Sequence, residues 1–223
     1  MTNTSETTLT ADDGHSFTVF CALPPEAPKA ALVVVQEVFG VNNHIRAVTT
    51  GFAERGYAAF APALFDRVEA GIELAYAGAD LERGRALRTE IGWTAPMRDI
   101  AATMALAAEH GAVGVIGYCW GGSLAFLSAT RLQPAAAVCY YGGQINDFRE
   151  ETAHCPVLMH CGERDTISPP DAVAAIRAAQ PTAGIHLYPA GHGFNCTERA
   201  DFDPDSARLA LERTELFLET HLA

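Results

Sequence analysis

The segment Gly-Tyr-Cys-Trp-Gly-Gly at residues 117–122 places the tightest constraint on the fold, because it directly follows an apolar run. Residues 112–116 are typical of a buried strand, and a helix is expected from Ser123 to Thr130. Cys119 must then lie on a sharp turn between the strand and the helix, with its side chain exposed to solvent. This is the nucleophile-elbow pattern with sulfur in place of oxygen. The glycines two residues before and two after the cysteine leave both crowded positions without a Cβ atom.

The helix after this turn points its N-terminus at the sulfur of Cys119. The helix dipole would favour a thiolate and a developing oxyanion there. The competing interpretation is structural, because free cysteines usually behave as small buried hydrophobic residues. The hexapeptide alone therefore indicates a reactive thiol without establishing one, and the rest of the chain must decide.

Length and composition predict one domain over residues 1–223, in which 49% of the residues are apolar and 19% are charged. The net charge of −12 disfavours nucleic acid and anionic membrane surfaces as partners. The polar start, Met1 to Thr10, carries no signal-peptide pattern, and no apolar run is long enough to span a membrane. Six scattered cysteines without a C-x-x-C motif favour reduced thiols and a cytoplasmic location.

Short apolar runs alternate along the chain with segments of helical periodicity. After a hairpin that turns at residues 12–15, the expected strands are 31–36, 57–61, 112–117, 135–141, 156–161 and 185–188. The expected helices are 43–55, 96–110, 122–132, 169–179 and 204–222, with an exposed Arg- and Glu-rich helical segment at 71–91. This alternation predicts an α/β fold, with a doubly wound, mostly parallel sheet and helices on both faces. Sites in such sheets lie at the carboxyl ends of the strands.

Three of these strand ends carry a nucleophile, an acid and a histidine in that chain order: Cys119, Asp165 and His192. α/β-Hydrolases use this order. The histidine takes the thiol proton and later returns it to the leaving group, while the carboxylate orients the imidazole. Taken singly, Asp165 could cap the next helix, Glu163 is a rival acid, and an isolated histidine is more often structural.

The first long apolar strand ends in Gln-Glu-Val-Phe-Gly at residues 36–40. An oxyanion hole in this fold takes one backbone N–H from this loop and one from the residue after the nucleophile. That nominates the backbone N–H groups of Val38 and Trp120. Glu37 is expected to point toward the same site, and the alternative is an exposed loop carboxylate.

Together these motifs resemble the dienelactone hydrolase (carboxymethylenebutenolidase) family of α/β-hydrolases. The resemblance covers nearly the whole chain and rests on QEVFGVN at 36–42, RGYAAFAP at 55–62, GYCWGG at 117–122, YYGG at 140–143, GERD at 162–165 and GHGF at 191–194. It implies cleavage of a lactone or activated ester, of the dienelactone-to-maleylacetate type found in aromatic catabolism. The reaction would proceed through an acyl-enzyme, without a cofactor or metal. A general carboxylesterase with another substrate is the main alternative.

The resemblance also assigns roles to four residues. Cys119 is the expected nucleophile, His192 the base and Asp165 the residue that orients it. Glu37 is expected to help generate the thiolate when substrate arrives. A carboxylate beside a thiol opposes its ionisation by like charge but can accept its proton.

The chain departs from the family where the substrate carboxylate is bound. The dienelactone enzymes have a serine directly after the histidine and an arginine a few residues later, whereas here residues 193–196 are Gly-Phe-Asn-Cys. Arg199 is a possible replacement. Arg83 and Arg85 are candidates for a second substrate-binding arginine, with solvated surface charges as the alternative, and Phe39 is a candidate pocket residue.

The sequence disfavours the other functions that these residues suggest. A peroxide-sensing thiol lacks an obvious resolving cysteine, and a non-enzymatic binding protein on this scaffold is expected to have lost a triad member. A metal site from His160, Cys161, His192 and Cys196 is disfavoured, because adjacent residues on a strand face opposite sides. We therefore expect a monomer or small homo-oligomer that acts on a small-molecule lactone or ester.

Overall fold

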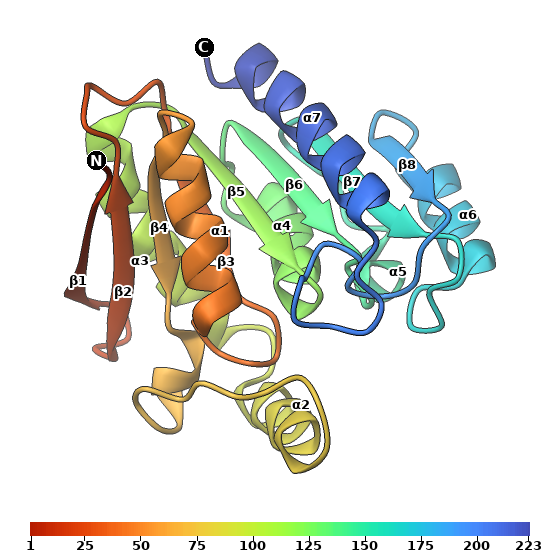
Figure 1. The fold of residues 1–223 in the computed structure, drawn as a ribbon, viewed down its shortest axis with the longest axis horizontal. Helices are drawn as coiled ribbons and strands as arrows, with labels where there is room; N and C mark the ends of the chain where they lie inside the picture. Colours follow the sequence, from red (N-terminus) through yellow and green to blue (C-terminus); the bar gives the residue numbers. More distant parts are fainter.

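The computed structural model describes residues 1–223 and is built around one eight-stranded sheet (Figure 1). Its strands are β1 (Asn3–Thr10), β2 (Ser16–Leu23), β3 (Ala31–Val35), β4 (Ala58–Pro62), β5 (Val113–Tyr118), β6 (Ala136–Tyr140), β7 (Val157–Gly162) and β8 (Gly184–Tyr188). The order across the sheet is β1-β2-β4-β3-β5-β6-β7-β8. β1 and β2 form the predicted hairpin, β2 is antiparallel to β4, and all other neighbours are parallel. The predicted fold is confirmed.

The helices cover both faces of the sheet, so the central strands are buried on both sides. They are α1 (Asn43–Glu54), α2 (Ala79–Ile91), α3 (Ala95–Ala107), α4 (Trp120–Arg131), α5 (Ile145–Phe148), α6 (Pro170–Ala179) and α7 (Pro204–His221), with 3-10 turns η1 (Leu64–Arg67) and η2 (Ala108–His110). α1 and α7 pack on one face, and α3, α4 and α6 on the other (Figure 1). Every residue of β3 is buried. None of the helices combines the length and apolarity needed to cross a membrane.

The starts of two helices differ most from the prediction. α2 covers only the second part of the predicted segment 71–91, because Gly71 and Gly78 have positive φ angles of 73° and 61° that interrupt a helix. α4 begins directly after Cys119 and not at residue 122. Gly121 and Gly122 have a low intrinsic helix propensity. Both residues nevertheless belong to α4. A Cβ atom on Gly121 would lie 2.3 Å from the carbonyl oxygen of Val35, and one on Gly122 would lie 2.5 Å from that of Tyr140, so only glycine fits at these positions.

A buried ion pair ties the segment after β4 to α3. The Arg67 guanidinium donates to both carboxylate oxygens of Asp99, at 2.8 and 2.7 Å, and reaches Asp13 in the β1–β2 turn at 2.9 Å. The Asp99 side chain is fully buried and that of Arg67 is 11% exposed. Such a pair matters most when it is broken, because the remaining charge stays buried without a partner.

Asp99→Ala is therefore expected to lower the free energy of unfolding by about 3 kcal/mol, since it removes the fully buried partner of Arg67 and leaves the guanidinium only its contact with the partly exposed Asp13. Urea unfolding followed by circular dichroism measures this loss. Arg85→Ala is the matched control, because that side chain forms only an exposed pair with Glu82 and should change little. Equal unfolding midpoints for the two variants would contradict the expectation.

Candidate active site

Cys119 lies at the turn between β5 and α4, where its φ angle is +55°. Residues other than glycine rarely adopt this left-handed conformation. A Cβ atom on Gly117 would lie 1.9 Å from the carbonyl oxygen of Gly121, and one on Gly121 would lie 2.3 Å from that of Val35. The Cys119 N–H donates to the carbonyl of Tyr140 at 3.0 Å. The predicted strand-turn-helix is confirmed, and contacts with other backbone atoms explain both glycines.

His192 lies between Cys119 and Asp165. Its Nε2 atom is 3.1 Å from the cysteine sulfur, and its Nδ1 atom is 2.8 Å from Oδ2 of Asp165. The other oxygen of Asp165 accepts hydrogen bonds from the backbone N–H groups of Ile167 at 2.7 Å and Ser168 at 3.1 Å. Both oxygens of the Asp165 carboxylate therefore have hydrogen-bond partners, and this fixes the position of the carboxylate beside Nδ1 of His192.

Burial distinguishes Asp165 from Glu163, the two acids that the sequence offered as partners of the histidine. The Asp165 side chain is fully buried and that of His192 is 6% exposed, whereas Glu163 is exposed to solvent. Asp165 is therefore the acid that contacts the histidine. The structure brings together the three residues that the sequence placed at separate strand ends.

The contacts of His192 shift the pKa values of both His192 and Asp165. Burial by itself lowers the pKa of His192, but negative charge on the Cys119 sulfur and the hydrogen bond to Asp165 outweigh it and raise the pKa to about 10. Burial opposes ionisation of Asp165 as well, yet His192 and the two backbone donors bring the pKa of that carboxyl below its usual value. The arrangement favours a positive imidazole beside the negative carboxylate of Asp165.

Glu37 is fully buried, which excludes the alternative of an exposed loop carboxylate. Its Oε1 atom accepts a hydrogen bond from Arg199 at 3.3 Å, and the Arg199 side chain is only 17% exposed. Burial raises the pKa of Glu37, and the positive charges of Arg199 and His192 oppose this rise. The guanidinium also lies 5.9 Å from the ring centres of Phe39 and Tyr76. Phe39, a predicted pocket residue, is thus buried beside the arginine.

The predicted oxyanion donors lie on two buried backbone segments. Trp120 is the first residue of α4, so its N–H has no partner within the helix. Val38 lies in the loop after β3, where its carbonyl oxygen would be 1.9 Å from a Cβ atom on Gly84. α2 therefore packs against this loop through a glycine and fixes the backbone on which the Val38 N–H is placed.

Arg83 and Arg85 flank Gly84, but both side chains lie at the surface. Arg83 pairs with Glu69 at 2.7 Å and Arg85 with Glu82 at 2.8 Å, and their exposed fractions are 48% and 51%. The structure brings neither arginine to the triad, because the residue that faces the site from this turn of the helix is the glycine between them. Arg199 is the arginine found at the site.

Sequence reasoning did not single out Tyr141, which follows β6 with a φ angle of +39°. Its ring centre lies 5.2 Å from that of His192 in an edge-on arrangement, and its buried hydroxyl has no hydrogen-bond partner. The available signal was the Tyr-Tyr-Gly-Gly segment at a strand end. A bulky residue in the left-handed region at such a position is often functional.

The metal site considered from the sequence is not assembled. His160 is buried, and both of its ring nitrogens already have partners: Nδ1 lies 2.7 Å from the hydroxyl of Tyr188, and Nε2 lies 3.0 Å from that of Thr214. The nitrogens of His192 are likewise occupied by Cys119 and Asp165. Neither histidine therefore has a ring nitrogen free to bind an ion.

A doubly wound sheet whose β5–α4 turn carries one side chain between a strand and a helix is the arrangement of the α/β-hydrolases, and this chain is a protein of that class. The sequence model of the dienelactone hydrolase family matches residues 17–222. The chain therefore belongs to the dienelactone hydrolase family, and it is a carboxylic ester hydrolase.

Individual relatives agree with this assignment. The carboxymethylenebutenolidase of Pseudomonas putida is 34% identical over 218 residues, which cover 92% of each chain. That of Pseudomonas sp. strain P51 is 32% identical over 221 residues, which cover 92% of this chain and 91% of the relative. The crystal structure of a Klebsiella pneumoniae protein provisionally named a dienelactone hydrolase has a TM-score of 0.82 at 28% identity, and covers 98% of this chain and 99% of that one.

The charges around His192 generate a prediction about its titration. Asp165→Asn and Cys119→Ala should each lower the pKa of His192 from about 10 toward its ordinary value of 6.5, because each removes a negative neighbour. Proton NMR of the imidazole across pH measures this. Asp147→Asn, at an exposed position, is the control that should leave the titration unchanged.

The raised pKa of His192 also makes the stability of the folded chain depend on pH. A raised pKa means that the folded chain holds the His192 proton more tightly than the unfolded chain does. The resulting stabilisation is complete below pH 6.5 and is lost as the pH rises toward about 10. A wild-type His192 that titrates near 6.5 would contradict both statements.

Proposed function

We propose that this chain hydrolyses a lactone or small activated ester, of the dienelactone-to-maleylacetate type, through an acyl-enzyme on Cys119. The contact of His192 with both Cys119 at 3.1 Å and Asp165 at 2.8 Å carries this proposal. It gives a nucleophile, a group that moves its proton, and a carboxylate that orients that group. The family assignment supports the same chemistry.

In the first half of the reaction, the sulfur of Cys119 attacks the carbonyl carbon and a C–S bond forms. The negative charge that develops on the carbonyl oxygen is held by the backbone N–H groups of Trp120 and Val38. The ester C–O bond then breaks, and the departing oxygen takes the proton from His192. The charge of Asp165 keeps the imidazole oriented while it changes protonation state.

In the second half, neutral His192 takes a proton from a water molecule, and the resulting hydroxide attacks the thioester carbonyl. The same two N–H groups stabilise the second oxyanion. Breaking the C–S bond releases the carboxylic acid product, and the sulfur leaves as the thiolate beside protonated His192. The cycle consumes one water and leaves the enzyme unchanged, without a cofactor or metal.

Arg199 and Glu37 give the site a preference for substrates that carry a carboxylate. The guanidinium already binds the carboxylate of Glu37 and lies beside Phe39. A substrate carboxylate would compete for the same guanidinium donors. Glu37, once released, could accept the proton of a Cys119 that is still a thiol, which is the role expected from the family resemblance.

The acidic surface supports a small-molecule substrate, because a net charge of −12 repels nucleic acid. The scattered cysteines favour a reducing compartment. We therefore also propose a cytoplasmic enzyme that works as a monomer or small homo-oligomer. A general carboxylesterase acting on uncharged esters is the second candidate, and substitution of Arg199 separates the two.

Cys119→Ala should lower kcat/KM for dienelactone and for an activated aryl ester by at least about 10³-fold, since no other group can form the acyl-enzyme. Spectrophotometric turnover of both substrates measures this, and circular dichroism checks the fold. Cys155→Ala, a substitution of a half-buried cysteine ahead of β7, is the matched control that should retain turnover. Turnover by Cys119→Ala at the wild-type rate would remove the proposal.

Arg199→Met should raise KM for dienelactone about 10- to 100-fold, the effect of losing a charge-assisted hydrogen bond to a carboxylate. The KM for an uncharged aryl ester should change far less. Arg83→Met is the matched control and should leave both values unchanged, because that side chain is paired at the surface with Glu69. Equal losses for the two substrates would favour the general carboxylesterase.

A further inference from the structure

Three side chains that ligate metals converge beside the triad without belonging to it: Glu37, His44 and Cys196. One ligand atom from each lies within 4.8 Å of the other two. Glu37 follows β3, His44 lies in the first turn of α1, and Cys196 follows β8. The exposed fractions of these residues are 0%, 5% and 0%. The fold thus brings a carboxylate, an imidazole and a thiol from three separate segments into one buried cluster.

Two atoms of this cluster lack the hydrogen bonds that buried polar atoms normally have. Oε2 of Glu37 and Nε2 of His44 are both buried and have no partner, although Oε1 of Glu37 is bound by Arg199. Leaving such groups unpaired costs free energy. A ligand that supplies partners to both atoms would recover this cost.

We propose that Glu37, His44 and Cys196 form a Zn²⁺ site. Thiolate, imidazole and carboxylate are the three ligand types that zinc takes in proteins, whereas calcium and magnesium prefer oxygen ligands alone. The thiol proton of Cys196 leaves to solvent on binding, because only the thiolate ligates the ion. The charge of the ion then balances those of the thiolate and the carboxylate.

The geometry requires only a small closure of the cluster. Zinc bonds of about 2.0–2.3 Å place the ligand atoms of a tetrahedral site roughly 3–4 Å apart. Atoms now within 4.8 Å of one another therefore move inward by roughly 1 Å, which side-chain rotation can supply. Arg199 opposes the ion by its charge, but it occupies only one of the two oxygens of Glu37.

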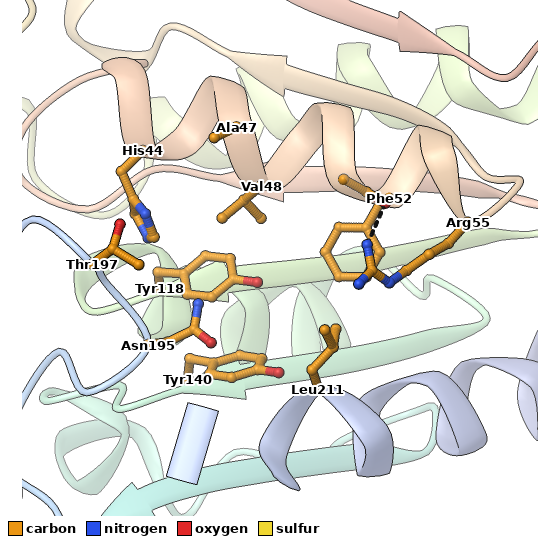
Figure 2. Close-up of a pocket in the computed structure, with 11 residues that line it drawn as sticks. His44, Ala47, Val48, Phe52, Arg55, Tyr118, Tyr140, Asn195, Thr197 and Leu211 are labelled. Atoms are coloured by element: carbon orange, nitrogen blue, oxygen red, sulfur yellow. Dashed lines mark hydrogen bonds between the residues drawn. The ribbon is translucent and has the colours of Figure 1, made fainter. Parts of the chain in front are cut away.

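A cavity of about 260 Å³ between α1 and α7 reaches one member of the cluster, His44. His44 lines this cavity together with Asn195 and Thr197, the two neighbours of Cys196. Figure 2 shows His44 near Thr197 at one end of the cavity, with the ring of Tyr118 close by. The cavity contains no triad residue, so an ion can reach His44 without passing Cys119.

Occupation of this site should slow turnover. The ion would hold Glu37, which we proposed to accept a proton from Cys119, so this consequence rests on the proposed function. The binding site itself does not, because its three ligands are independent of the triad. Zinc is thus proposed as an inhibitory ligand and not as a cofactor of the reaction.

Co²⁺ is the probe, because it replaces zinc and gives a thiolate-to-metal charge-transfer absorption. The test uses the full chain carrying Cys119→Ala, which excludes binding of the metal to the triad sulfur. We expect this absorption with one Co²⁺ per chain, and we expect Zn²⁺ to displace it. Absence of the absorption in this variant would overturn the proposal.

Each of two ligand substitutions, Cys196→Ser and His44→Gln, is added to Cys119→Ala and should weaken Co²⁺ binding at least about 100-fold. Loss of a residue that binds the metal directly costs at least as much affinity as loss of a residue that only hydrogen-bonds to a ligand. Circular dichroism confirms that each variant is folded, and having two ligand variants guards against failure of one. Cys155→Ser in the same background is the matched control and should bind normally. Unchanged absorption in the folded Cys196→Ser variant would also overturn the site.

Turnover of an aryl ester tests the inhibitory role separately. Zinc should inhibit the wild-type chain, and Cys196→Ser should shift the half-inhibiting zinc concentration upward by at least about tenfold, the equivalent of 1.4 kcal/mol. Cobalt binding without zinc inhibition would overturn the inhibitory role alone. If the chain cleaves no ester at all, the proposed function fails while the cobalt measurement still decides the site.

Discussion

The close approach of β5 and α4 at Cys119 is the contact on which the rest of the site depends. The Cβ positions of Gly117 and Gly121 would each lie within 2.5 Å of a backbone oxygen, so the strand and helix can meet only where these side chains are missing. This contact forces Cys119 into the left-handed region and keeps its sulfur beside the ring of His192. A side chain at either glycine would have to displace Cys119, because the neighbouring backbone on both sides cannot move aside.

Around this turn, the site contains buried charged groups, each of which lies beside a group of opposite charge. Asp165 holds His192, and His192 contacts Cys119. Arg199 donates a hydrogen bond to Glu37. Charges of this kind are stable in a buried site only when they are paired, so a change in one partner affects the next. This coupling explains why a substrate carboxylate or a metal ion at Glu37 could influence the thiol without touching it.

The fold and the order of the proposed catalytic residues could be predicted because both depend on local patterns. Apolar runs and helical periodicity fix the alternation of strands and helices, and parallel strands then bring their carboxyl ends to one edge. Glu37 and Arg199 are 162 residues apart, and no local pattern shows that they meet. The sequence offered Arg83 and Arg85, like Arg199, as candidates for binding a substrate carboxylate. Arg83 and Arg85 lie on the outer side of α2, because Gly84 is the residue that packs inward.

The sequence by itself determined the hydrolase architecture and the elbow, because glycine spacing and strand order are constraints on the backbone. Only the tertiary structure decided which charged side chains are buried together. The loop after β8 folds back over the end of β3, and this places Arg199 and Cys196 beside Glu37 and leaves His44 facing the same cluster. Side-chain direction depends on the packing of distant segments. The arginine proposed to bind a substrate carboxylate and the proposed zinc ligands could therefore be recognised only in the folded chain.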